Sequence, residues 1–68
     1  MNQWTKIFTT LRLAEGSIVE GMLLESQISV QRLNKQDSSY PVLGEAEIYV
    51  PVHLKDTALQ LIQQTFSQ

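Results

Sequence analysis

The chain has 68 residues, of which 43% are hydrophobic and none is cysteine, so it suits one small domain without disulfides. Its formal net charge is −2 at pH 7, and its five basic residues form no run, which disfavours nucleic acid and anionic membranes as partners. Apolar runs are too short to cross a bilayer, and the N-terminal residues lack a signal-peptide pattern. We therefore expect a single cytoplasmic α+β domain over residues 1–68.

The first predicted element is a strand over residues 4–10, which are rich in aromatic, β-branched and threonine side chains. Strict alternation places Ile7 and Phe8 on opposite faces of this strand. Only one of them can then face the core, and the pattern leaves open which one does.

Residues 13–26 change to a helical period. Gly16 and Gly21 each weaken a helix interior, so we expect that the helix needs small residues there to approach the sheet closely. The predicted buried stripe consists of Ala14, Ile18, Val19, Met22 and Leu23.

A second strand is predicted over residues 28–34 and a third over residues 46–50, joined by a loop over residues 35–44. In the third strand, alternate residues are expected to point toward the core: Ala46, Ile48 and Val50.

A second helix is predicted over residues 53–66, after Pro51 ends the third strand. Its glutamines lie on the opposite side from its apolar residues, which is typical of a helix with one buried stripe. That stripe consists of Ala58, Leu59, Ile62 and Phe66.

This order of elements predicts a ferredoxin-like βαββα fold, in which the third strand enters between the first two. The expected sheet has the strand order 1-3-2, with both helices on one face. The outer edge of the first strand would be unpaired and could accept a strand from another chain.

The other face of the sheet is the predicted interaction surface, because apolar side chains of neighbouring strands gather there. Phe8, Leu33 and Tyr49 form this patch, with Ile7 in place of Phe8 if Phe8 belongs to the core. The long loop adds Tyr40, Val42 and Leu43, which could dock a partner.

No residue combination predicts catalysis, a cofactor or a metal site, so we expect a protein that is not an enzyme. His53 is the only histidine and stands where a helix begins, which favours a surface role. Residues 37–39 (Asp-Ser-Ser) lack a nearby base and fit a turn. Glu45 and Glu47 share one strand face, where a solvated surface is more plausible than acid–base chemistry or a cation site.

Two segments resemble a small bacterial family described as prokaryotic signal-transducing proteins. Residues 15–28 resemble its first helix and turn, and residues 47–51, followed by Ala58 and Ile62, resemble its "Val-Pro" strand and second helix. The chain departs from the family at Gln27, where a helix-ending glycine is common.

The resemblance implies a trimmed version of the PII (GlnB-like) fold, and it supplies no catalytic residues. In PII proteins the loop between strands two and three carries the signal, and the matching position here is residues 35–45. We expect a non-enzymatic regulatory or protein-interaction module, in line with this resemblance. The apolar patch and the unpaired edge of the first strand further lead us to expect that it self-associates, for example as a dimer, through the open sheet face or that edge. The alternative is a small-molecule or nucleotide sensor that binds its ligand under residues 35–45.

Overall fold

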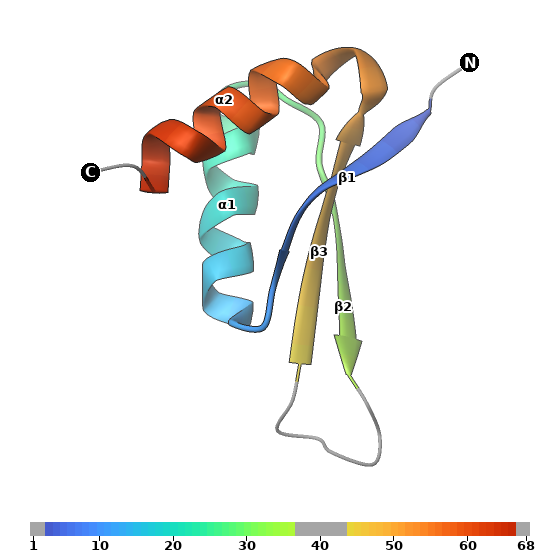
Figure 1. Ribbon diagram of the computed structural model, residues 1–68, viewed down its shortest axis with the longest axis vertical. Coiled ribbons are helices and arrows are strands. Elements are labelled where there is room, and N and C mark those ends of the chain that lie inside the picture. The colour runs from blue at the N-terminus through green and yellow to red at the C-terminus, as the bar shows by residue number, and fades with distance from the viewer. Residues whose placement is uncertain (1–2, 37–43, 67–68) are drawn as a thin grey trace.

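Three strands and two α-helices make up the part of the chain that the computed structural model describes, residues 3–36 and 44–66 (Figure 1). The predicted order of elements is confirmed, and the largest shift is in the second strand, which begins three residues later than expected. None of the helices in these residues is long and apolar enough to cross a membrane. The elements are β1 (Trp4–Thr10), α1 (Leu13–Glu25), β2 (Gln31–Gln36), β3 (Gly44–Pro51), the 3-10 turn η1 (Val52–Leu54) and α2 (Lys55–Phe66).

The strands form one antiparallel sheet in the order β1-β3-β2, which confirms the predicted strand order and the α+β class. β3 is the central strand, and its successive side chains alternate between the core and the opposite, open face of the sheet because the strand is pleated. Ala46, Ile48 and Val50 are fully buried, as predicted.

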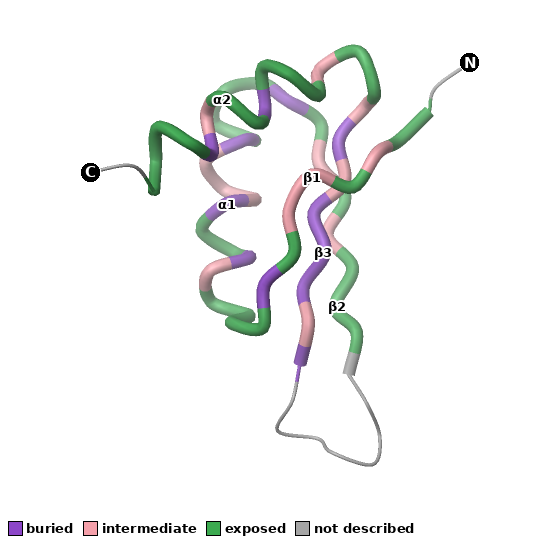
Figure 2. The backbone as a smooth tube through the Cα atoms, in the orientation of Figure 1, coloured by how far each residue is buried: buried purple, intermediate pink, exposed green. Residues whose placement is uncertain are grey.

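The core lies where the helices pack on this buried row of β3, and Figure 2 shows buried positions concentrated along β3. In α2, Ala58 and Ile62 are buried as predicted, but Leu59 and Phe66 are exposed. The side of α2 that faces the core is turned away from Leu59 and toward Leu61, which packs half-buried against the core cluster. The buried cluster consists of Val19, Leu23, Ile28, Ile48, Val50, Ala58 and Ile62.

A register shift in β1 overturns the expected alternation of its side chains. Lys6 pairs with Tyr49 and Phe8 pairs with Ile48, so Ile7 is an extra residue of the kind that a β-bulge inserts. Ile7 and Phe8 both pack, half-buried, against the core cluster. The prediction that only one of them could face the core is wrong, because it assumed uninterrupted pairing.

The N-terminal half of α1 lies very close to the sheet. A Cβ atom on Gly16 would stand 2.8 Å from the Cβ of Ala46, which is closer than two such atoms can pack. The predicted close approach is therefore confirmed at Gly16. It is wrong for Gly21, where no neighbouring heavy atom outside the adjacent residues and the helix's own nearby backbone lies within 4 Å of the position a Cβ would take.

The buried side of α1 is narrower than the predicted stripe. Val19 and Leu23 are fully buried, whereas Ala14 is exposed and Ile18 has 59% of its surface exposed. Ile18 and Val19 are adjacent in the sequence and so lie about 100° apart around the helix. Only the row that contains Val19 faces the sheet.

The C-terminus of α1 ends in a Schellman motif. The backbone N–H of Ile28 donates to the carbonyl of Leu23 at 3.0 Å, and that of Gln27 donates to the carbonyl of Leu24 at 3.0 Å. Gln27 has a φ of 65°, the left-handed conformation that glycine adopts more easily. The chain then turns back so that Ile28 enters the core next to Leu23.

Candidate functional site

The structure does not bring the predicted interaction patch together. Leu33 and Tyr49 lie on the open face, where Leu33 pairs with Glu47 across the strands and has 47% of its surface exposed. Phe8 points to the helix side because of the shifted register, and Ile7 packs against the core and does not replace it. The loop residues Tyr40, Val42 and Leu43, and most of the loop proposed to cover a ligand, lie outside the described residues.

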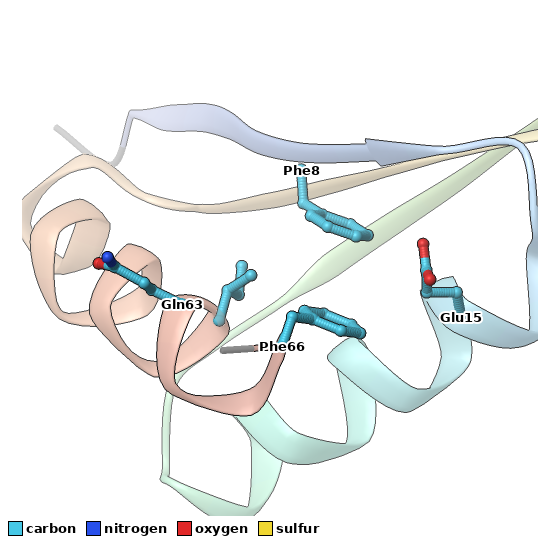
Figure 3. A pocket seen from close by; sticks show the side chains of 5 residues that line it. Phe8, Glu15, Gln63 and Phe66 are labelled. Carbon is cyan, nitrogen blue, oxygen red and sulfur yellow. The ribbon is translucent and has the colours of Figure 1, made fainter. Parts of the chain in front are cut away.

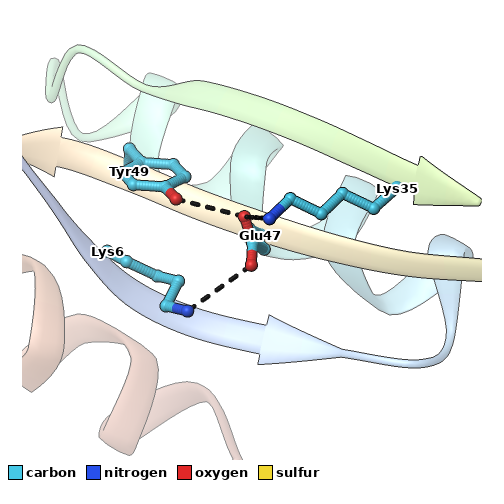
Figure 4. Close-up of polar contacts among 4 residues, drawn as sticks. All are labelled: Lys6, Lys35, Glu47 and Tyr49. Carbon is cyan, nitrogen blue, oxygen red and sulfur yellow. Dashed lines mark hydrogen bonds and ion pairs between the residues drawn. The ribbon is translucent and has the colours of Figure 1, made fainter.

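The centre of the open face is occupied by the carboxylate of Glu47, which is 3% exposed. The Nζ of Lys6 lies 3.4 Å from Oε2, and the Nζ of Lys35 lies 3.2 Å from Oε1 (Figure 4). The hydroxyl of Tyr49 donates to Oε1 at 3.1 Å. The two lysines come from the strands on either side of β3, and their long side chains reach diagonally over the sheet to Glu47.

These contacts set the charge state of the network. Burial by itself raises the pKa of Glu47, but hydrogen bonds from Lys35 and Tyr49 and the charges of the two lysines outweigh burial and hold that pKa below its ordinary 4.5. The hydrogen bond to Glu47 is the main cause that raises the pKa of Lys35 above 10.5. Glu47 is therefore ionised and Lys35 protonated at neutral pH.

The expectation of a solvated acidic face is thus wrong for Glu47, because the neighbouring side chains fold over it. Both of its carboxylate oxygens accept contacts from within the sheet. A carboxylate held in this way is a structural ion-pair centre and is badly placed to accept a proton from a substrate.

Within the part of the chain that is described, no group of three or more His, Cys, Asp or Glu side chains could hold a metal ion. His53 lies exposed in η1.

The side of α1 that faces away from the sheet is a second candidate surface. Ala14, Ile18 and Gly21 follow one another at spacings of four and three, so they share one side of the helix, which we call the outer face of α1. The same row continues at the exposed Glu25, four residues after Gly21, so an apolar stretch of about two turns ends in a carboxylate. Sequence reasoning missed this surface because it merged two adjacent helical rows into one buried stripe. Other exposed apolar residues on or beside α1 are Leu11, Leu13 and Leu24.

A cleft of about 290 Å³ opens between β1 and α2 and is the third candidate. Its walls include Phe8 and Phe66, whose rings are parallel with centroids 5.8 Å apart (Figure 3). Glu15 reaches it from the first turn of α1, and Ile62 and Gln63 complete the lining. No sequence signal links these positions, because the register shift that turns Phe8 inward is not visible in the side-chain pattern.

Comparisons with protein-family models, with curated proteins and with solved structures found no match to this chain. The resemblance to signal-transducing proteins therefore stays a prediction.

Proposed function

We propose that this protein is a non-enzymatic regulatory or protein-interaction module that pairs with a second copy of itself through the outer face of α1. The observation that carries the proposal is the exposure of an apolar row on that helix, with Ile18 at its centre and 59% of its surface exposed. Burying an aliphatic side chain of this size contributes about 1.5–3 kcal/mol when it leaves water completely.

The shape of the outer face suits a second copy. Ile18 projects between Ala14 and Gly21, and the space beside Gly21 is open to at least 4 Å. In a twofold pair the same surface meets itself, so Ile18 of each helix can fill the gap beside the small residues of the other. A small chain without disulfides also gains stability when it buries apolar surface in an oligomer.

The open face of the sheet fits this role less well than expected from the sequence. Its centre is the Glu47 network with Lys6 and Lys35, and the cores of protein interfaces are depleted of charged residues. We therefore place the proposed contact on the outer face of α1 and not on the open face of the sheet.

The regulatory part of the proposal depends on the fold and the resemblance together. The strand order β1-β3-β2 and the packing of both helices in one core cluster support a ferredoxin-like βαββα layout, with three strands in the described residues. That layout suits a relative of the bacterial, cytoplasmic PII proteins, and the step from such a fold to signalling is an analogy.

Light scattering after size-exclusion chromatography tests the self-association directly. We expect the mass of the wild type to rise toward that of a dimer as its concentration increases, and Ile18→Glu to remain monomeric, since it places a charge in the contact. Gln60→Glu is the matched control, because it adds the same charge to an exposed position of α2 and should leave the dimer intact.

A wild type that stays monomeric up to about 1 mM would contradict the proposal, since this limit corresponds to only about 4 kcal/mol of association free energy. Loss of the dimer in Gln60→Glu as well would show that the contact lies elsewhere. Circular dichroism of each variant verifies that the exposed substitutions leave the fold unchanged.

A further inference from the structure

The cleft between β1 and α2 has one apolar wall and one polar end. The rings of Phe8 and Phe66 form the wall, with the buried side chain of Ile62 beside them. Phe66 keeps 45% of its surface exposed, so the wall remains accessible from solvent. A volume of about 290 Å³ is at the lower end of the range of about 300–1,000 Å³ for small-molecule pockets, which suits a small ligand.

Glu15 forms the polar end, and its carboxylate is held in place before any ligand arrives. The hydroxyl of Thr10 donates to Oε1 of Glu15 at 2.7 Å, and the same oxygen of Thr10 accepts the backbone N–H of Arg12 at 3.0 Å. Thr10 is itself buried. The orientation of Glu15 therefore costs little to maintain when a ligand binds.

In residues 3–36 and 44–66, no cationic side chain forms an ion pair with Glu15. The rings of Phe8 and Phe66 are stacked parallel to each other, so they supply the apolar contact and the carboxylate alone supplies the charge. The complementary ligand is positive at one end and apolar along the rest. The ion pairs in these residues are Lys6–Glu47, Lys35–Glu47 and Arg32–Glu20.

We propose that this cleft binds a small primary amine with an aromatic or aliphatic body. Its ammonium group donates a hydrogen bond to the carboxylate of Glu15, and its hydrocarbon part lies against Phe8 and Phe66. The proposal does not depend on the self-association of α1, because Ile18 is not part of the cleft lining.

Titration with 2-phenylethylamine, followed by amide chemical shifts in NMR spectra, tests the proposal. We expect shifts that saturate in the millimolar range and that are largest around Glu15, Gln63 and Phe66, as suits a ligand with few atoms. The isosteric alcohol 2-phenylethanol has the same body without the charge and should bind about tenfold more weakly, since charge-assisted hydrogen bonds are the stronger ones.

Two substitutions measure separately how much the charge of Glu15 and the apolar wall contribute to binding. Glu15→Gln should weaken amine binding about tenfold and bring it close to that of the alcohol, whereas the exposed Glu25→Gln should not change it. Glutamine is well accepted at the third position of a helix, so the fold should persist. Phe66→Ala should weaken both compounds, because both use the wall.

Equal affinity for the amine and the alcohol would contradict the proposal that the carboxylate of Glu15 recognises the ammonium group. Shifts that are absent up to about 10 mM, or that cluster away from the cleft, would overturn the site itself, since this range covers the weakest specific binding. Because Ile18→Glu should keep amine binding and Glu15→Gln should keep the dimer, failure of one proposal is distinguishable from failure of the other.

Discussion

Gly16 and Gly21 stand five residues apart in α1, but only Gly16 lies against a neighbour. The missing side chain of Gly16 leaves room for Ala46, whose Cβ is fixed to the backbone of the central strand and cannot move aside. Gly21 faces open space. The first glycine therefore sets the distance between helix and sheet, while the second weakens the helix and makes no close contact within the single chain.

Alanine at each position should change stability in opposite directions. In Gly16→Ala, an overpacking cost of about 1–3 kcal/mol exceeds the helix gain of about 1 kcal/mol, so the free energy of unfolding should fall. In Gly21→Ala, measured at concentrations where the protein is monomeric, the gain of about 0.5–1 kcal/mol should appear alone. Thermal unfolding measures both, since about 1 kcal/mol shifts Tm by about 4–8 °C in a domain this small. A higher Tm for Gly16→Ala would contradict the close contact.

Glu47 should make stability depend on pH at both ends of the scale. Because its pKa is lower in the folded state, its contribution is present above pH 4.5 and is lost as pH falls through the folded pKa. The raised pKa of Lys35 has the reverse sign: its contribution is present below pH 10.5 and is lost as pH rises through the folded pKa.

The variant Glu47→Gln isolates this effect. Urea unfolding should find the wild type more stable than Glu47→Gln at neutral pH, with a difference that shrinks in acid and again in strong alkali. The exposed Glu25→Gln should follow the wild type throughout. A difference that is the same at pH 3 and at pH 7, by contrast, would mean that Glu47 acts through packing and not through its charge.

At the scale of elements, the end of α1 combines a favourable motif with an unfavourable residue. The two Schellman hydrogen bonds stabilise the turn into β2, yet Gln27 must adopt a φ of 65° to form them. An L-residue with a side chain adopts this conformation at a cost of about 1–2 kcal/mol.

Gln27→Gly should therefore raise the free energy of unfolding by about 1 kcal/mol, because glycine adopts a positive φ without steric cost. Ser26→Gly is the neighbouring control: its φ of −89° needs no glycine, so the substitution should lower stability. Chemical denaturation of the two variants measures whether each substitution raises or lowers the free energy of unfolding. Equal effects at the two positions would show that the conformation of Gln27 is not the cause.

The elements also show what could be predicted from the sequence. Element types and the buried row of β3 follow from local periodicity, which depends only on neighbouring residues, and the strand order follows from the order of elements and the rules for connecting strands. The register shift at Ile7 does not, because an extra residue is specified by pairing with a distant strand. The exposed row of α1 could not be predicted for a related reason. Ile18 and Val19 are both apolar, and only the position of the sheet decides which one is buried.

The candidate site was less predictable than the fold. Placing Phe8 correctly requires the register of β1, and joining it to Glu15 and Phe66 requires the packing of both helices. The Glu47 network likewise depends on Lys6 and Lys35 reaching across from two strands. Such constellations form between elements, so their members have no fixed spacing along the chain.

At the scale of the whole molecule, little apolar surface is available to stabilise 68 residues. The chain nevertheless leaves an apolar row on α1 and an aromatic wall beside α2 exposed to solvent. A domain whose free energy of unfolding is small becomes more stable when a partner or a ligand covers such surfaces.

The extra residue in β1 also bears on how the protein behaves at high concentration. β1 is an edge of the sheet in the described part of the chain, and flat edges let copies of a protein add strand to strand into fibrils. The register shift at Ile7 bends this edge and breaks its even row of hydrogen-bonding groups. The same residue that turns Phe8 toward Phe66 thus interrupts the edge along which strands of other copies could add without limit.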